Sequence, residues 1–259
     1  MGVMQPGVDH LVAILARTRI EPHHVVLGHT LIGLAAAWLL AGGSWFAWLG
    51  AALLLQLKSL LDNVDGGLAR ATGRVTRMGR YLDTLMDLVV NAALFFALAQ
   101  HGPAWLSLAA FVTLTWVLSL EFNAMRRHLE ESGEARTSAV PASVPPGAPP
   151  GVLAWLEGAY ALLLAPQDRL LRRLDERLFA EAAGMEWSQA SDAERRRWAD
   201  SYSVAMLVNL GLSTQLLLLG TCAAVGLPYA YVMLVILQIP YVLLVQASRV
   251  RRYRAARPA

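Results

Sequence analysis

Four aspartates lie at fixed offsets within a 26-residue stretch of a chain that otherwise consists largely of long apolar runs. Asp62 and Asp65 are three residues apart and Asp83 and Asp87 are four apart, so on helices the members of each pair share one face. Carboxylates at membrane depth are costly and persist mainly where they pair, bind cations or line a wet cavity. Four of them close together require a cation, and oxygen ligands of this kind indicate Mg2+, or the similar Mn2+, bridging carboxylates to substrate phosphates.

The alternative to a metal site is a set of ion pairs at a solvated helix end. The arginines available for it lie between the two aspartate pairs: Arg70, Arg74, Arg77 and Arg80. Because ionisable residues inside a membrane are functional in most cases, we favour the metal site.

The aspartates belong to a longer pattern, D-x2-D-G-x2-A-R-x8-G-x3-D-x3-D. Its eight fixed points are Asp62, Asp65, Gly66, Ala69, Arg70, Gly79, Asp83 and Asp87. At average residue usage, a chance match has a probability on the order of 10^-10 per start position. The pattern resembles the signature of the CDP-alcohol phosphotransferases, also called CDP-alcohol phosphatidyltransferases. These membrane enzymes join an alcohol to the phosphate of a CDP-linked donor and release CMP.

The resemblance implies a role for each matching residue. Asp62, Asp65 and Asp83 would hold the divalent metal, and Asp87 would share a second ion and act as general base toward the attacking hydroxyl. The nucleotide would be bound by Asp62, Gly66, Ala69, Arg70 and Gly79. The alternatives for Ala69 and Arg70 are a packing residue and a helix-end charge. The resemblance also implies a homodimer.

Composition indicates an all-α, polytopic membrane protein. The chain is 56% hydrophobic with a mean hydropathy of +0.44, and it contains several apolar runs of about 20 residues, the length that spans a bilayer. We predict six transmembrane helices, near residues 25–41, 45–61, 82–99, 104–120, 204–225 and 229–247. Residues 8–19 alternate apolar and polar positions and predict a short interfacial helix before the first span.

Basic residues predict the topology. They precede the first span, separate the second from the third, and follow the fourth and sixth, whereas the opposite loops, AGGSW, QHGPAW and VGLPY, contain no Lys or Arg. By the positive-inside rule, both termini and the aspartates face the cytoplasm. We expect an integral membrane protein of a bacterial or archaeal inner membrane. The net charge of +3 is therefore a topological signal and an attraction to membrane lipids, not a nucleic-acid footprint. A single cysteine, Cys222, excludes an internal disulfide.

The organisation along the chain follows from these patterns. We predict an N-terminal interfacial helix (1–24), a catalytic group of four spans (25–127), a cytoplasmic insert (128–203), and two final spans with a basic tail (204–259). The insert combines a Pro-rich linker with amphipathic helices. One of these helices begins near Pro166 and Asp168, and another is predicted by a Ser191–Glu194 capping box.

The first insert helix is predicted to be amphipathic and basic. Its apolar face would carry Leu170, Leu171, Leu174, Leu178 and Phe179, with four arginines elsewhere. Packing at the membrane interface is the simplest role for such a helix, and covering the active-site mouth or binding a partner are alternatives.

Polar residues outside the motif give two further expectations. Glu121, Asn123 and Arg126 end the fourth span at cytoplasmic depth and form a possible acceptor pocket, with a structural ion pair as the alternative for Glu121. Lys58 lies four residues before Asp62 and would either reach a phosphate or extend to the interface.

The start of the first span departs from the family pattern. Many relatives have Pro-Asn there and a hydroxyl residue three positions beyond the Asn. In this chain Pro22 is followed by His23, and Val26 takes the later place. The usual hydrogen bonds of the segment would therefore have to come from His23 or His24.

The leading hypothesis is a membrane phospholipid synthase. It would use CDP-diacylglycerol and a small polar alcohol to make a phosphodiester lipid and CMP. A second hypothesis within the same chemistry uses a CDP-choline-like or CDP-ethanolamine-like donor and a lipid hydroxyl as acceptor. Hypotheses of another class are a non-enzymatic membrane scaffold or an ion transporter, but the acids cluster at one membrane face and form no path across it.

Overall fold

The computed structural model describes residues 5–133 and 150–256, and helices account for most of both ranges. The described residues contain no strand, which confirms the all-α prediction. The helices are α1 (Gln5–Leu15), α2 (Pro22–Ala41), α3 (Trp45–Ala71), α4 (Arg77–Leu98), α5 (Ala104–Ser132), α7 (Pro150–Leu163), α8 (Ala165–Ala183), α9 (Asp192–Trp198), α10 (Ser201–Val208), α11 (Leu212–Ala224), α12 (Ala230–Ile236) and α13 (Gln238–Ala255). A 3-10 turn, Trp187–Gln189, separates α8 from α9.

Five helical segments are long and apolar enough to cross a membrane. They are Pro22–Ala41, Arg77–Leu98, Ala104–Ser132, Asp192–Ala224 and Ala230–Ala255. The second predicted span, now α3, is not among these five. It carries Lys58 and Asp62 in its second half, and such residues lower the apolarity of the helix.

Helix boundaries differ from the sequence prediction in four places. Both α3 and α5 continue well past the predicted span ends at Leu61 and Leu120. The last predicted span is broken between α12 and α13, where Pro240 cannot donate a hydrogen bond to the carbonyl of Ile236. The preceding span is likewise broken, between α10 and α11.

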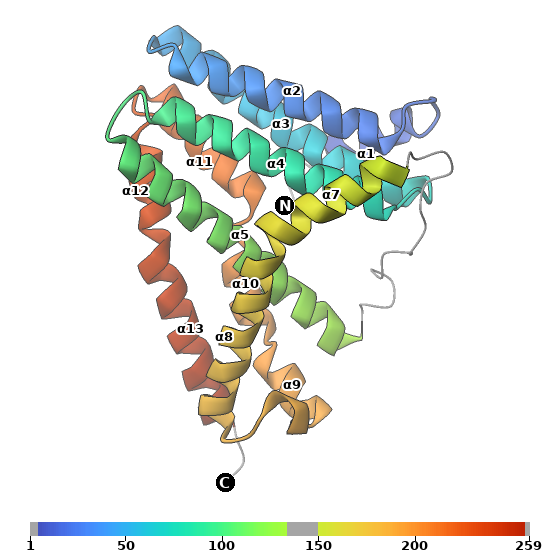
Figure 1. The fold of residues 1–259 in the computed structure, drawn as a ribbon, viewed down its shortest axis with the longest axis vertical. Helices are drawn as coiled ribbons and strands as arrows, with labels where there is room; N and C mark the ends of the chain where they lie inside the picture. The colour runs from blue at the N-terminus through green and yellow to red at the C-terminus, as the bar shows by residue number, and fades with distance from the viewer. Residues whose placement is uncertain (1–4, 134–149, 257–259) are drawn as a thin grey trace. The chain divides into compact units, whose positions relative to one another are not determined.

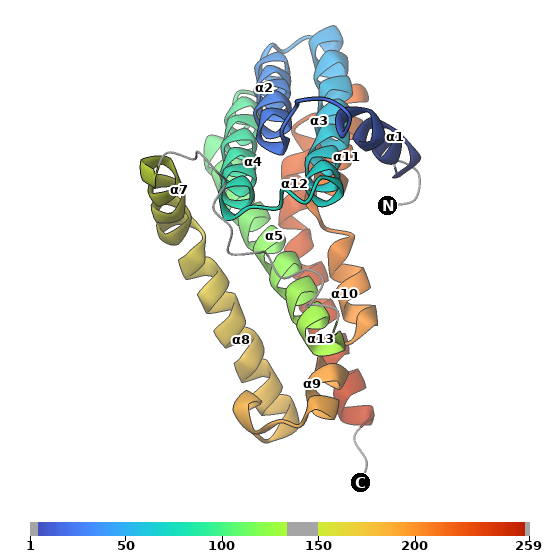
Figure 2. The same ribbon diagram turned by 90° about the vertical axis from the view of Figure 1, so that its right-hand side faces the viewer.

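Contacts divide the chain into two units, and the first unit contains every residue of the motif. It comprises residues 1–111, 140–160 and 215–233. Within it, α2 packs along α3 and α4 (Figure 1). The predicted N-terminal helix is α1, which packs against α3 (Figure 2). Val8 of α1 is buried with Val64 and Leu68, and Gly67 leaves room for Val12, because a Cβ at Gly67 would lie 2.9 Å from Val12 Cγ2.

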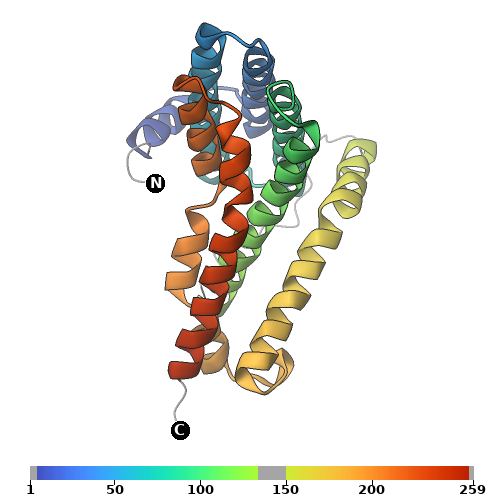
Figure 3. The same cartoon turned by 90° about the vertical axis from the view of Figure 1, so that its left-hand side faces the viewer.

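The second unit comprises residues 112–139, 161–214 and 234–259. In this unit α8 and α10 both pack against α13 (Figure 3). The capping box at Ser191 and Glu194 is present and starts α9, as predicted. The Pro-rich linker lies largely outside the described residues. The predicted division of the chain at residues 24, 127 and 203 concerns the membrane topology and stays a prediction.

The predicted apolar face of α8 is buried within the unit only in part. Phe179 is fully buried against Trp198 and Tyr253, and Leu178 packs at the edge of this cluster. Leu170 and Leu174, however, are 43% and 46% exposed. Asp175 lies on the inward side of the helix, where its carboxylate has polar partners within the unit.

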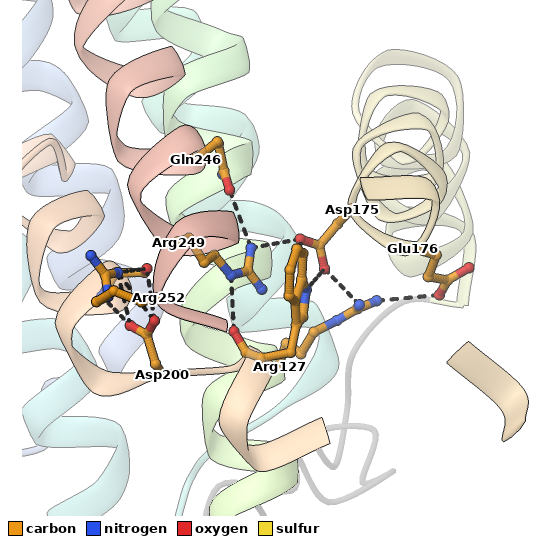
Figure 4. A network of polar contacts seen from close by, with 9 residues as sticks. Arg127, Asp175, Glu176, Asp200, Gln246, Arg249 and Arg252 are labelled. Carbon is orange, nitrogen blue, oxygen red and sulfur yellow. Dashed lines mark hydrogen bonds and ion pairs between the residues drawn. The ribbon is translucent and has the colours of Figure 1, made fainter. Parts of the chain in front are cut away.

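Asp175 joins three elements of the second unit (Figure 4). Its Oδ2 accepts from Arg127 of α5 at 2.6 Å, and its Oδ1 accepts from Arg249 of α13 at 2.6 Å. Arg249 also donates through Nε to the carbonyl of Trp198 at 2.9 Å and lies over the indole ring. The insert is therefore attached to α5 and α13 by a shared carboxylate, not only by apolar contacts.

We expect Asp175→Asn to destabilise the protein by about 3 kcal/mol, because it leaves two largely buried guanidinium groups without their common anion. Thermal unfolding in detergent, followed by tryptophan fluorescence, measures the change. The matched control is Glu176→Gln on the same helix, since the Glu176 side chain is 37% exposed and pairs with Arg127 only at 3.2 Å. Equal losses for the two variants would contradict the assigned role of Asp175.

Candidate active site

Two helices and one short turn position the motif. Asp62, Asp65, Gly66, Ala69 and Arg70 all lie in the last turns of α3. The chain then turns at Gly73, whose φ of +67° favours glycine. Thr76 caps α4 by accepting from the backbone N–H of Gly79 at 3.1 Å, and α4 carries Asp83 and Asp87.

The structure brings the four carboxylates of α3 and α4 together, as the spacing predicts. A fifth polar group lies among them, the imidazole of His29 from α2. His29 Nε2 lies 2.9 Å from Asp65 Oδ2, 3.7 Å from Asp83 Oδ1 and 3.8 Å from Asp62 Oδ1. His29 is fully buried, whereas the Asp83 side chain is 37% exposed and gives the cluster a path to solvent.

Lys58 supplies a buried cation on the other side of the cluster. Its Nζ donates to Asp87 Oδ1 at 2.7 Å and to Asp62 Oδ1 at 3.0 Å, and so links α3 to α4. The residue is fully buried, so it does not extend to the interface, and its other predicted role, contact with a phosphate, stays a prediction. Buried lysines are rare unless paired, and these two carboxylates are the pairing partners.

His29 was missed by the sequence analysis, which considered His23 and His24. In the structure His24 accepts the backbone N–H of Glu21, and His23 pairs with Glu21 at 3.2 Å, so both belong to the start of α2. The available signal for His29 was its place inside a predicted span, where a polar residue is functional in most cases.

The predicted nucleotide residues surround the end of α3. Gly66 and Ala69 are half-buried, and Arg70 is exposed near Gly66, with its Nη1 3.4 Å from the position of a Cβ there. Gly79 lies in the first turn of α4. Their roles toward a nucleotide stay predictions.

The predicted acceptor residues belong to the second unit. There Asn123 donates to Asp168 Oδ1 at 3.1 Å and to the carbonyl of Ser119 at 2.8 Å. Arg126 pairs with Glu130 at 2.9 Å, and the Glu121 carboxylate lies about 4 Å from the position of a Cβ at Gly211. The acceptor-pocket role of these residues stays a prediction.

The donor set of the cluster fits a divalent cation. Two sets of three side chains could each hold an ion, because the ligand atoms within a set all lie within 4.8 Å of one another. One set is His29, Asp65 and Asp83, and the other is His29, Asp62 and Asp87. Asp83 Oδ1 is buried and has no hydrogen-bond partner among the described residues, so an acceptor is aimed into the cluster without a donor. Carboxylate oxygens suit Mg2+ and Mn2+, and imidazole is a ligand that favours later transition metals.

The apolar helices and the carboxylate cluster that could hold a metal ion fit a membrane enzyme that acts on phosphates. The chain belongs to the CDP-alcohol phosphatidyltransferase family, whose sequence model matches residues 21–164 and so covers 144 of the 259 residues. Proteins of this family are transferases of substituted phosphate groups.

Several curated proteins are similar to this chain. The bifunctional IPC transferase and DIPP synthase of Aquifex aeolicus is 34% identical over 128 residues, which are 49% of this chain and 24% of that protein. The archaetidylinositol phosphate synthase of Pyrococcus horikoshii is 30% identical over 138 residues, 51% of this chain and 67% of that protein. The phosphatidylinositol phosphate synthase of Streptomyces avermitilis is 35% identical over 92 residues, 35% of this chain and 37% of that protein.

A close approach of α2 to α4 keeps His29 and Lys58 in the cluster. A Cβ at Gly33 would lie 2.6 Å from Val90 Cγ1 and 3.3 Å from Lys58 Cδ. We expect Gly33→Ala to destabilise the protein by about 1–3 kcal/mol and to lower activity, because the β-branched Val90 has little room to move.

The matched control for Gly33→Ala is Gly28→Ala in the same helix, where a Cβ meets nothing within 4 Å. That variant should be neutral or gain about 0.5–1 kcal/mol, since alanine is the better helix former. Thermal unfolding of both variants measures the difference. An unchanged melting temperature for Gly33→Ala would show that α2 and α4 do not depend on this contact.

Proposed function

We propose that this chain is a metal-dependent phospholipid synthase that transfers a phosphatidyl group from CDP-diacylglycerol to a small polar alcohol and releases CMP. The observation that carries the proposal is the cluster of four motif aspartates around the buried His29 and Lys58. Asp62, Asp65 and Asp83 would hold the divalent ion, Mg2+ or Mn2+, with Asp87 at the edge of the site. The bound ion would neutralise charge on the donor diphosphate.

The proposed chemical step is the attack of the acceptor hydroxyl on the donor, with Asp87 accepting its proton. The acceptor oxygen attacks the phosphorus that carries diacylglycerol, a P–O bond forms, and the bond from that phosphorus to the oxygen of CMP breaks. CMP leaves with the electron pair. Asp87 takes the hydroxyl proton on Oδ2, because Oδ1 is already bonded to Lys58 and no hydrogen bond to Oδ2 occurs among the described residues.

The binding partners follow from the same assignment. Gly66 and Gly79 lack side chains and would let the cytidine and ribose approach α3 and α4, with Asp62 and Ala69 beside them and Arg70 near the diphosphate. We further propose six transmembrane helices, with α3 as the sixth, both termini and the aspartates on the cytoplasmic side, and a homodimer in the membrane.

The relatives suggest where to begin the search for the acceptor. Phosphatidylinositol phosphate and archaetidylinositol phosphate synthases both occur among them, so an inositol phosphate is the first acceptor to test. Glu121, Asn123 and Arg126 are the proposed acceptor residues. A CDP-choline-like donor with a lipid hydroxyl as acceptor is the alternative, because the motif serves both arrangements.

The experiment is CMP release by the purified protein in detergent with Mg2+. We expect release with CDP-diacylglycerol and one acceptor from a panel of inositol phosphate, glycerol phosphate, serine and inositol. Diacylglycerol with CDP-choline or CDP-ethanolamine tests the alternative. Absence of release with every pair, together with absence of CDP-donor binding, would contradict the proposed function.

We expect Asp65→Asn to abolish turnover and to weaken metal-dependent nucleotide binding, because it removes ligand charge next to His29. Calorimetric metal titration of this variant measures the second effect. Full metal affinity would show that Asp65 is not a ligand.

Asp87→Asn separates base from ligand. We expect the single-turnover rate of CMP release to fall by a factor of roughly 10^2–10^4, while donor binding and metal affinity change little, because the main task of Asp87 is to accept a proton. Metal affinity that falls in step with the rate would identify Asp87 as a ligand first.

A further inference from the structure

The cation of the aspartate cluster is the only lysine in the chain. The sequence contains 22 basic residues of the Lys and Arg types, and all except Lys58 are arginines. Arginine presents a broad planar fork, whereas lysine presents a compact point charge with three donors. At the one place where the chain uses lysine, a small cation reaches two carboxylates from different helices.

The contacts of Lys58 resemble those of a bridging ion more than those of a surface ion pair. Nζ lies 2.7 Å from Asp87 Oδ1 and 3.0 Å from Asp62 Oδ1, and the side chain is only 1% exposed. The stem passes close to Gly33 of α2, since a Cβ there would lie 3.3 Å from Lys58 Cδ. Packing thus directs the ammonium inward, toward the two carboxylates.

The two pairs of aspartates in the cluster, Asp62 with Asp87 and Asp65 with Asp83, have different partners. Asp62 and Asp87 already share the Lys58 ammonium. Asp65 and Asp83 have His29 Nε2 at 2.9 and 3.7 Å, and Asp83 Oδ1 has no hydrogen-bond donor among the described residues. Asp65 and Asp83, the half that contains the buried acceptor Asp83 Oδ1, therefore lack the permanent positive charge that Lys58 gives to Asp62 and Asp87.

We propose that the Lys58 ammonium takes the place of a second cation, so that each chain holds one divalent ion, on the side of Asp65 and Asp83. A divalent ion bridging Asp62 and Asp87 would face the ammonium at close range, with twice the repulsion of two unit charges. Lys58 has no other carboxylate partner among the described residues, so displacing it would leave a charge buried without an anion. This inference rests on the metal site of the proposed function.

The experiment is the stoichiometry of Mn2+ bound to the full chain in detergent, without donor or acceptor. Free Mn2+ is followed by its electron paramagnetic resonance signal during titration. The wild-type protein should bind one Mn2+ per chain, and Lys58→Met should bind two, because it removes the competing charge and keeps most of the side-chain volume. Lys58→Arg is the matched control and should remain at one, since the cation is retained.

A second measurement needs no variant and keeps the inference testable if Lys58→Met does not fold. At saturating Mn2+, the spectrum of the wild-type protein should be that of an isolated ion, without the spin coupling of two ions a few ångströms apart. Thermal unfolding in the same detergent establishes that each variant is folded, and added Mn2+ should raise the melting temperature of Lys58→Met more than that of the wild type.

The outcomes separate this inference from the proposed function. Two bound ions or spin coupling in the wild type would overturn the role of Lys58 while leaving CMP release intact. One ion in a folded Lys58→Met variant would also overturn it. Absence of Mn2+ binding together with absence of CMP release would overturn both.

Discussion

The neutralisation of four carboxylates inside a helical membrane protein is the constraint on which the rest of the first unit depends. One buried ammonium and one buried imidazole face Asp62, Asp65, Asp83 and Asp87. To bring these groups together, α3 must continue beyond the apolar segment so that its carboxylates reach the first turns of α4. For the same reason α2 must approach α4 closely at Gly33, so that His29 reaches Asp65.

The same constraint accounts for which side chains of the cluster are fixed by contacts and which are accessible. His29 and Lys58 are fully buried, and each is fixed by contacts to another helix. Asp83 is partly exposed, and Asp87 retains an oxygen without a hydrogen bond among the described residues. Preorganised charge of this kind favours phosphoryl transfer, because the protein contributes positioning and electrostatic stabilisation instead of covalent chemistry.

The spacing of residues along the chain predicts much of the candidate site. Asp62 with Asp65 and Asp83 with Asp87 follow the helix period, so their shared faces and the helices beneath them were predictable. The Ser191 capping box and the start of α8 are local signals of the same kind, and both are present. The break before α13 also had a local signal in Pro240, which the span prediction did not use.

The side-chain contacts between different helices could not be predicted from the sequence patterns. Which polar residue of α2 reaches the aspartates depends on how α2 packs, so the nearby His23 and His24 were considered and His29 was not. Lys58 has one partner within its own helix, which spacing indicates, and one on α4, which it does not. Asp175 is similar, because a carboxylate on the inner face of α8 is stable only through arginines of α5 and α13.

The central claim is that a divalent ion held by this cluster contacts the diphosphate of a CDP-linked donor. The most direct test is electron–nuclear double resonance on Mn2+-loaded protein mixed with CDP-diacylglycerol. We expect a phosphorus-31 hyperfine coupling that requires both Mn2+ and the donor and that disappears in Asp65→Asn. Bound Mn2+ without any phosphorus coupling, in protein shown to bind the donor, would contradict it.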